Sequence, residues 1–395
     1  MNICFLTKDY FPNIKGGVGS YVYEISHALT KLGHRIFVIT SVESPDYDCK
    51  IDNDEGIMVF RVKPVSLSFL NLFRERIPGL VERLEYSFAV SKKLKEIHRK
   101  YHIDIVEGYE ARAEGFWFYL FRRSPPLVIK LHTPEGIIFK WNGTPDSLDI
   151  KLITKLEEFW LMRAKKIVGI TKSIVELAKI LYGFNSISVI HNPLDITKFK
   201  NVSAYELSNE INILYVGRLE FRKGVHVLIK AIPKVLEKIP TAKFTFIGDD
   251  CGMKWFLENK INEFGCREQV NLIPHISRDK LIDYYLQATI CVIPSLWENF
   301  PYTCLEPMAL GKVVVAANAG GIREIIEDGI NGILFTPGSY QDLANKIISV
   351  CLDIQLRKKI ESNARKRIEL LCNPEKIAKE TINIYESCLN NDKAH

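Results

Sequence analysis

The first half of the chain alternates short apolar runs with amphipathic stretches. The apolar run Asn2–Thr7 leads through a glycine-rich loop into an amphipathic segment that ends at Gly33, and a second apolar run, Arg35–Thr40, follows. This order predicts a strand–helix–strand unit at the start of the chain. We expect further strands at Ile103–Glu107, Leu127–His132, Lys166–Ile170 and Ser188–Ile190, and helices at Leu80–Tyr101 and Leu148–Ala164. The first half should therefore form a parallel sheet with helices on both faces.

The same alternation of apolar runs and amphipathic stretches starts again after the turn-like segment His191-Asn192-Pro193. Strands are expected at Asn212–Val216, Lys243–Ile247, Val270–Ile273, Ile290–Ile293 and Val313–Ala316, and helices at Val225–Leu236 and Met253–Phe264. We therefore predict two doubly wound α/β domains, 1–195 and 196–373, and a C-terminal segment, 374–395, whose helix packs back onto the first domain. Ligands bind such sheets beyond the carboxyl ends of the strands, so the two domains should face a shared central cleft.

Composition agrees with this organisation and narrows the class of protein. A chain of 395 residues with 47% hydrophobic residues usually needs more than one core. The nine cysteines are scattered, which predicts reduced thiols and a cytoplasmic protein. The first residues read neither as a signal peptide nor as a membrane span, and no later apolar run approaches roughly 20 residues. A net charge of +6 is too small to favour nucleic-acid binding.

The segment 294–311 holds two carboxylates, Glu298 and Glu306, after an apolar strand. Thr303-x-x-Glu306 matches a capping box, Pro307 suits a first helical turn and Gly311 suits the position after a helix. Capping is therefore an alternative explanation for Glu306. It does not explain Glu298, which is flanked by aromatic residues and proline in a loop. A carboxylate in such a place is suited to hydroxyl-rich ligands.

Two further loops precede helices and carry candidate anion-binding groups. The first contains Arg218, Arg222 and Lys223, whose charges oppose the dipole of the helix that follows unless an anion binds there. The second contains Gly16, Gly17 and Gly19, where the backbone could approach a phosphate or a sugar. A solvated basic turn is the alternative for the first loop, and the glycine spacing of the second matches neither a dinucleotide fingerprint nor a P-loop.

Together these motifs resemble the retaining glycosyltransferases of family 4, which have the GT-B fold and include glycogen synthases, sucrose synthases and bacterial mannosyl- and glucosyltransferases. The resemblance extends over nearly the whole chain. Its parts are Tyr10-Phe11-Pro12, Gly16 to Gly19, Val189 to Asp195, Val216 to Gly224, Pro294 to Gly311 and Ala319 to Glu324. Two departures are Asn299, where members often have glycine, and Asn192-Pro193, where they often have Asn-Gly.

The resemblance assigns most of the donor-binding residues to the second domain. It implies that Glu306 holds the ribose hydroxyls of a nucleotide sugar. It further implies that Glu298 and the backbone amides of Asn299, Phe300 and Pro301 hold the donor sugar. The loop that contains His275 and Ile276 would face the nucleobase through its main chain. The donor would be a UDP- or GDP-linked hexose.

The resemblance also assigns the residues around the leaving group. Arg218 and Lys223 would neutralise the departing diphosphate, Gly16 and Gly17 would lie near it, and His132 would lie beside the sugar. Negative charge develops on the diphosphate as the glycosyl bond breaks, and fixed cations stabilise that charge without a metal or another cofactor. No carboxylate is obviously placed as a nucleophile, and the resemblance implies attack on the face that the diphosphate leaves.

Two pairs of acidic residues could instead indicate a metal-dependent transferase. Asp46-Tyr47-Asp48 and Asp52-Asn53-Asp54 match such pairs superficially, but they fall in a polar stretch that we interpret as a solvated loop. The acceptor is expected to offer a hydroxyl on a glycan, a lipid-linked sugar or a small molecule. The apolar and basic segment Leu67–Arg76 and the basic helix face near Lys92-Lys93-Leu94-Lys95 could contact an anionic membrane, although a buried loop and a solvated helix face also explain them.

Two other classes of protein share parts of this pattern. A nicotinamide-dependent dehydrogenase should have Gly-x-Gly-x-x-Gly directly after a strand, which this chain lacks. A nucleotide-sugar-binding protein without transfer activity should have lost some of the charged residues, yet Arg218, Lys223, Glu298 and Glu306 are all present. The sequence therefore favours an enzyme.

Overall fold

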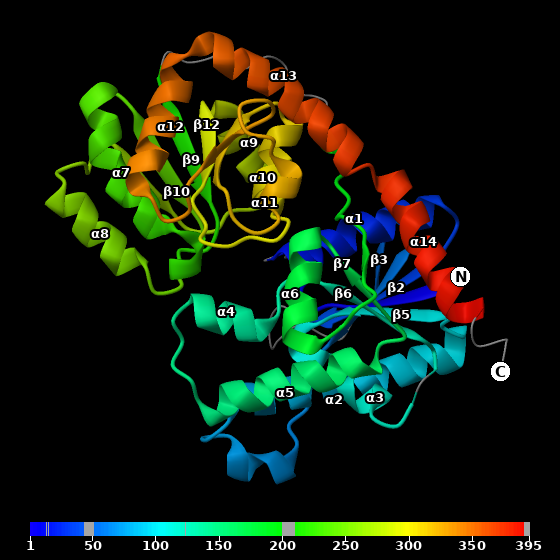
Figure 1. The fold of residues 1–395 in the computed structure, drawn as a ribbon. Coiled ribbons are helices and arrows are strands. Elements are labelled where there is room, and N and C mark those ends of the chain that lie inside the picture. The colour runs from blue at the N-terminus through cyan, green and yellow to red at the C-terminus, as the bar shows by residue number, and fades with distance from the viewer. Residues whose placement is uncertain (13, 15, 43–50, 123, 200–209, 391–395) are drawn as a thin grey trace. The chain divides into compact units, whose positions relative to one another are not determined.

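The computed structural model describes residues 1–12, 14, 16–42, 51–122, 124–199 and 210–390 (Figure 1). They form two compact units, each a sheet covered by helices. Unit 1 comprises Met1–Pro193 and the segment that begins at Pro374, and unit 2 comprises Leu194–Asn373. The two units are Rossmann-like α/β domains, so the predicted fold class is confirmed.

The sheet of unit 1 has the strand order β3-β4-β2-β1-β5-β6-β7-β8. The strands are β1 (Asn2–Leu6), β2 (Arg35–Ser41), β3 (Ile51–Asp54), β4 (Ile57–Val62), β5 (Ile105–Tyr109), β6 (Leu127–Leu131), β7 (Lys166–Gly169) and β8 (Ser188–Val189). All pairs are parallel except β3–β4, so the prediction of a purely parallel sheet is wrong at this edge. The reversal is the tight turn at Glu55-Gly56, where both residues have positive φ.

Helices cover the unit 1 sheet and include the segment that returns from the end of unit 2. Helix α14 packs against α1, and the Tyr385 hydroxyl of α14 donates a hydrogen bond of 2.7 Å to Glu107 of β5. The α-helices are α1 (Gly17–Lys31), α2 (Pro78–Tyr101), α3 (Phe116–Tyr119), α4 (Glu135–Trp141), α5 (Leu148–Arg163), α6 (Lys172–Tyr182) and α14 (Pro374–Asn390), with 3-10 turns η1 (Ser68–Phe73) and η2 (Ala111–Ala113).

The sheet of unit 2 is parallel throughout, in the order β11-β10-β9-β12-β13-β14. Its strands are β9 (Asn212–Val216), β10 (Lys243–Ile247), β11 (Val270–Ile273), β12 (Ile290–Ile293), β13 (Val313–Ala317) and β14 (Ile333–Phe335). Its helices are α7 (Val225–Lys238), α8 (Lys254–Glu263), α9 (Arg278–Gln287), α10 (Tyr302–Ala309), α11 (Ile322–Ile325), α12 (Tyr340–Leu352) and α13 (Ile354–Leu371), with 3-10 turns η3 (Ile196–Phe199) and η4 (Phe221–Lys223).

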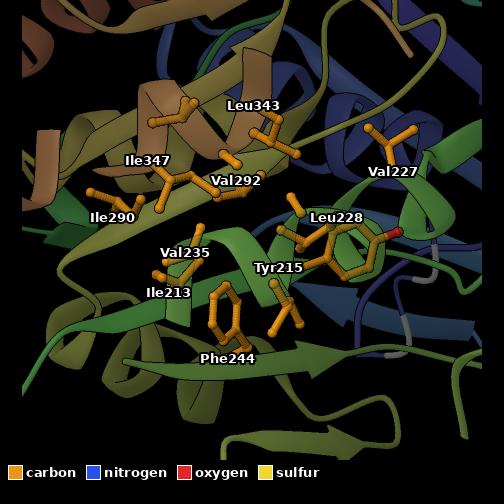
Figure 2. Close-up of a cluster of buried hydrophobic side chains, with 14 of the residues drawn as sticks. Ile213, Tyr215, Val227, Leu228, Val235, Phe244, Ile290, Val292, Leu343 and Ile347 are labelled. Atoms are coloured by element: carbon orange, nitrogen blue, oxygen red, sulfur yellow. The ribbon is translucent and has the colours of Figure 1, made fainter. Parts of the chain in front are cut away.

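The unit 2 core explains why its strands read as continuous apolar runs. Figure 2 shows Leu228 and Val235 of α7 and Ile347 of α12 in one cluster with side chains of β9 and β12, such as Ile213 and Ile290. Strands covered by helices on both faces need apolar side chains in both directions. The core thereby fixes the strands whose carboxyl ends carry the polar loops.

Each sheet has one point where the strand order changes direction. In unit 1 it lies between β1 and β5, and in unit 2 between β9 and β12. The loops that leave two such neighbouring strands diverge to opposite sides of the sheet and leave room for a ligand between them. The candidate loops 217–224 and 294–301 follow β9 and β12, so they flank the switch point of unit 2.

Candidate functional site

The loops after β9 and β12 are in direct backbone contact. The Leu296 amide donates to the Arg222 carbonyl over 2.9 Å. Gly224 has a φ of +70°, and a Cβ there would lie 1.8 Å from the Pro294 carbonyl oxygen. Only glycine fits this position, so the close approach explains why the basic loop ends in Gly224.

Lys223, which is partly exposed, and buried Glu298 form an ion pair across these two loops. Glu298 also accepts a hydrogen bond of 2.9 Å from the Ser295 hydroxyl. Burial acts to raise the pKa of Glu298, but the neighbouring Lys223 and Arg222 outweigh it and the net shift is downward. Burial lowers the pKa of Lys223, partly against the attraction of Glu298. The structure thus brings together two of the predicted site residues.

The other two cations of the loop share one carboxylate, Glu220. Arg222 is buried and lies 2.8 Å from Glu220, and Arg218 lies 3.1 Å from the same oxygen. Glu220 and Glu298 therefore offset two of the three positive charges and leave one net positive charge, which corrects the expectation of basic residues opposed only by the helix dipole. Arg218 keeps half of its side chain exposed, so it is the cation most accessible to a ligand.

Two neighbouring glycines, Gly320 and Gly321, contact the backbone of Glu298. The Gly321 amide donates to the Glu298 carbonyl over 2.9 Å, and a Cβ on Gly320 would lie 2.0 Å from that oxygen. Asn299 and Phe300 are buried, and Pro301 directly precedes α10. Gly320 and Gly321 thus fix the path of the predicted sugar-binding segment.

Glu306 does not cap its helix, which removes capping as the alternative explanation for this residue. Helix α10 begins at Tyr302, no side chain caps it, and both Glu306 and Pro307 lie in its interior. The helix starts directly after Pro301, whose fixed φ already suits a helix entry, so Thr303 lies inside rather than before the first turn. The predicted end of the helix is confirmed, since Gly311 has a φ of +72°.

The Glu306 carboxylate instead contacts α9. Arg278 Nε lies 3.0 Å from one carboxylate oxygen, and the Tyr285 hydroxyl lies 3.3 Å from the other. The predicted base-facing residues, the exposed His275 and the half-buried Ile276, lie in the loop that leads from β11 to Arg278. The Arg278 contact could not be predicted from the sequence, because the partners are far apart in the chain.

In unit 1, Gly16 and Gly17 lie at the start of α1, as the glycine-rich loop suggested. The Gly16 amide donates to the Asp9 carboxylate over 2.9 Å. The glycine without room for a side chain is Gly19, where a Cβ would lie 2.8 Å from Asp9 Oδ2. Gly16 and Gly17 are exposed.

His132 follows β6, and a buried carboxylate fixes its backbone. Glu110, in the segment after β5, accepts the His132 amide with both oxygens at 2.9 Å and also accepts the Thr133 amide. Burial raises the pKa of Glu110 to about 8, although the His132 amide opposes the shift. Burial, together with nearby Lys130, lowers the pKa of His132 to about 3, so its imidazole is neutral at physiological pH. Glu110 escaped the sequence analysis, though its place after a buried strand was a usable signal.

The acidic segments do not form a metal site in the described chain. Asp52 and Asp54 lie in β3 rather than in a solvated loop, where Arg61 pairs with Asp52 at 2.8 Å and Tyr10 donates to Asp54 at 2.9 Å. Asp46 and Asp48 lie outside the described residues. Within the described ranges, no three His, Cys, Asp or Glu side chains are grouped closely enough to hold a metal ion. No described helix is long and apolar enough to cross a bilayer.

Comparisons with known proteins identify the family. Residues 15–198 match the family described as Glycosyltransferase Family 4, and residues 198–367 match Glycosyl transferases group 1. An uncharacterized glycosyltransferase of Methanocaldococcus jannaschii is 29% identical over 407 residues, covering 98% of each chain. The sucrose-phosphate synthase of Thermosynechococcus elongatus has a TM-score of 0.81 at 20% identity over 99% of each chain. HepE of Anabaena, solved in complex with UDP-glucose, has a TM-score of 0.72 at 21% identity, covering 98% of this chain and 100% of that one.

The two family matches meet at residue 198, close to the junction between units 1 and 2. They therefore divide the chain much as the structure does, and the motifs around Lys223, Glu298 and Glu306 fall inside the second match. The chain is an enzyme of glycosyltransferase family 4, with the GT-B fold.

Proposed function

We propose that this enzyme transfers a hexose-type sugar from a UDP- or GDP-linked donor to a hydroxyl acceptor and retains the anomeric configuration. The observation that carries the proposal is the partly buried Lys223–Glu298 pair, with Arg218 in the same loop, at the switch point of unit 2. Crystal structures of the similarly folded HepE contain UDP and UDP-glucose, which supports a nucleotide-sugar donor.

In the proposed reaction, the bond between the anomeric carbon and the diphosphate oxygen breaks while the acceptor oxygen bonds to that carbon on the same face. The diphosphate oxygen takes the acceptor proton. Lys223 and the exposed Arg218 stabilise the charge that grows on the diphosphate, so the chain supplies this stabilisation without a metal. Glu298 keeps Lys223 in place and its carboxylate accepts hydrogen bonds from sugar hydroxyls.

The remaining predicted residues keep the roles that the family resemblance gives them. The amides of Asn299, Phe300 and Pro301 assist Glu298 in binding the sugar. Glu306 binds the ribose, and the loop of His275 and Ile276 contacts the base. In unit 1, Gly16 and Gly17 are assigned to the diphosphate and His132 to the sugar. A neutral His132 can both donate and accept a hydrogen bond, as a sugar hydroxyl requires.

A thermal-shift panel of UDP, GDP, ADP and their sugars tests the donor class. A ligand that binds only the folded protein raises its melting temperature. We expect UDP or GDP and the matching sugar to do so. If no nucleotide raised the melting temperature, the proposal would fail. Product analysis with that donor then separates a transferase from a protein that only binds nucleotide sugars.

Variants separate the roles of the two sites in unit 2. Lys223→Ala should mainly lower turnover, because its charge is needed most as the diphosphate departs. Glu306→Ala should mainly weaken nucleotide binding. Lys230→Ala, which removes an exposed cation from α7, is the control and should change neither. The reverse pattern for Lys223 and Glu306 would refute these roles.

We propose in addition that unit 1 contacts an anionic membrane carrying the acceptor. The segment Leu67–Arg76 is not a buried loop, because Leu72 is 87% and Phe69 is 58% exposed. Arg74 and Arg76 directly follow these apolar side chains, a combination suited to an anionic lipid surface. One cation of each candidate is engaged, Arg74 by Glu85 at 2.6 Å and Lys93 by Glu96 at 2.7 Å, so it is the exposed apolar side chains that make η1 the better candidate.

Vesicle co-sedimentation at low salt tests this contact. The protein should sediment with vesicles that contain anionic lipid and less so with neutral ones. Phe69→Ser with Leu72→Ser should abolish the difference. Leu370→Ser is the control, since it removes a similarly exposed apolar side chain from unit 2. Wild-type protein that stayed in the supernatant with anionic vesicles would contradict the proposal.

A further inference from the structure

We propose that Tyr215 and Glu220 position Arg218 for the departing diphosphate. This rests on the proposed function, in which Arg218 stabilises the charge that grows on the leaving group. A long side chain stabilises such charge best when it is ordered before the bond breaks, because no reorganisation is then needed during the reaction. Tyr215 holds the backbone of Arg218, and Glu220 holds its guanidinium.

Tyr215 ties the loop after β9 to the core of unit 2. Its hydroxyl donates a hydrogen bond of 2.8 Å to the Arg218 carbonyl, and its ring lies buried in the core cluster (Figure 2). Burial, together with the nearby carboxylates of Glu298 and Glu220, raises the pKa of Tyr215 well above its ordinary value. The hydroxyl therefore stays protonated and donates to the Arg218 backbone.

Gly217 lets the tyrosine hydroxyl reach over the turn. It has a φ of +151°, and a Cβ there would lie 3.0 Å from the Tyr215 hydroxyl oxygen, which a ring packed in the core has little room to avoid. The loop is held on both sides of its turn. The Gly217 amide donates to the Ile247 carbonyl over 2.9 Å, and the Leu219 amide donates to the Asp249 carbonyl over 2.8 Å.

Glu220 holds the far end of the Arg218 side chain. Arg218 Nη2 lies 3.1 Å from a Glu220 oxygen. Glu220 is itself fixed, since it is buried and the same oxygen lies 2.8 Å from buried Arg222. The Arg222 carbonyl in turn accepts the Leu296 amide of the loop after β12. The Arg218 guanidinium is thereby linked to the loop that carries Glu298.

Arg218 remains accessible although it is held at two points. Its side chain is 48% exposed, whereas those of Glu220 and Arg222 are each 5% exposed. Glu220 carries one negative charge beside two guanidinium groups, so it orders Arg218 without neutralising both. A diphosphate therefore meets a cation whose position is already set, which reduces the entropy cost of the contact.

Hydrolysis of the donor by Tyr215→Phe tests the backbone contact. The donor is UDP-glucose or GDP-mannose, whichever stabilises the protein in the thermal-shift panel, and water replaces the acceptor. The variant should lower kcat about tenfold and change KM by less than about twofold, because a misplaced cation is missed mainly in the transition state.

Tyr119→Phe is the matched control in unit 1. The Tyr119 hydroxyl is also buried and donates over 2.8 Å to a backbone carbonyl, that of Pro125. Both variants lose a similar hydrogen bond, but only Tyr215→Phe should lower kcat. A folded Tyr215→Phe with the kcat of Tyr119→Phe would overturn the inference.

Guanidinium rescue tests the second contact and does not depend on Tyr215→Phe being folded. Arg218→Ala should lower kcat, and guanidinium ion should restore part of the loss because the place of the side chain is half exposed. Sodium chloride at the same ionic strength should restore none. When Glu220→Gln is added, guanidinium should no longer help, since the carboxylate that holds the cation is gone. A structural role for Glu220 alone would leave the rescue unchanged.

Equal recovery in both variants, or recovery in neither, would overturn the role of Glu220. Failure of the proposed function looks different. A wild type that bound no nucleotide sugar would overturn that function before any variant was made. Arg218→Ala with the wild-type kcat would show that Arg218 does not act on the leaving group at all.

Discussion

At the scale of single residues, one lysine lies buried inside unit 1. Lys130 of β6 is 2% exposed, and its ammonium lies 4.2 Å from the centre of the Tyr21 ring. Burial lowers its pKa from 10.5 to about 8, while nearby Glu107 opposes the shift. Tyr21 also contacts His132, with ring centres 5.3 Å apart. The charge of Lys130 is thus linked to the surroundings of a candidate site residue.

The lowered pKa makes the contribution of Lys130 to stability depend on pH. Between pH 8 and 10.5 the unfolded chain binds more protons at this lysine than the folded chain does, so its contribution becomes more favourable as pH rises. The free energy of unfolding of the wild type minus that of Lys130→Met should therefore increase from pH 7.5 to pH 10. Urea unfolding measures both. A difference that is constant with pH would contradict the lowered pKa.

At the scale of elements, the contact between the loops after β9 and β12 depends on Gly224. Gly224→Ala should destabilise unit 2 by several kcal/mol, because backbone strain of about 1–2 kcal/mol is joined by a clash with the Pro294 carbonyl. Gly329→Ala is the matched control, since Gly329 has a φ of +73° and nothing within 4 Å of its Cβ position. Denaturant unfolding compares the two, and equal losses would show that the close approach carries no energy.

The elements that could be predicted from the sequence are those whose hydrophobic residues follow one regular spacing along the chain. Strands β12 and β13 were recognisable because both of their faces are apolar and buried. The β3–β4 hairpin was missed because Asp52 and Asp54 are polar, and their partners Arg61 and Tyr10 lie elsewhere in the sequence. The capping-box alternative at Thr303 failed because Pro301, two positions earlier, already starts α10.

The residues of the candidate site also fall into two groups, those that the sequence could indicate and those that it could not. Lys223 and Glu298 were predictable because each lies in a loop directly after a buried strand. Glu110 also follows a buried strand and could have been singled out by the same signal, whereas Arg278 acts by contacting a residue more than 20 positions away, and no local pattern records such a contact. Sequence thus indicates the residues that follow the strands, but not the partners that orient them.

At the scale of the whole molecule, the chain leaves unit 1, forms unit 2 and then returns. Tyr385 of α14 donates to buried Glu107, which also accepts from Tyr21 at 2.7 Å. Tyr385→Phe should destabilise unit 1 by about 1–3 kcal/mol, because one oxygen of a buried carboxyl loses its partner. Calorimetry should show a lower melting temperature for the transition of unit 1, and Tyr340→Phe, at a more exposed position in α12, should not. An unchanged thermogram for Tyr385→Phe would contradict a stabilising role for this contact.

The return of α14 also has a consequence for the order in which the protein matures on the ribosome. Multidomain chains usually fold their amino-terminal domain first during synthesis. Here all of unit 2 is translated before α14, so unit 2 can finish folding while unit 1 still lacks the helix that packs against α1 and contacts Glu107. The first domain to be synthesised is the last to be completed, and the surface that α14 will cover stays available to chaperones until translation passes Tyr385.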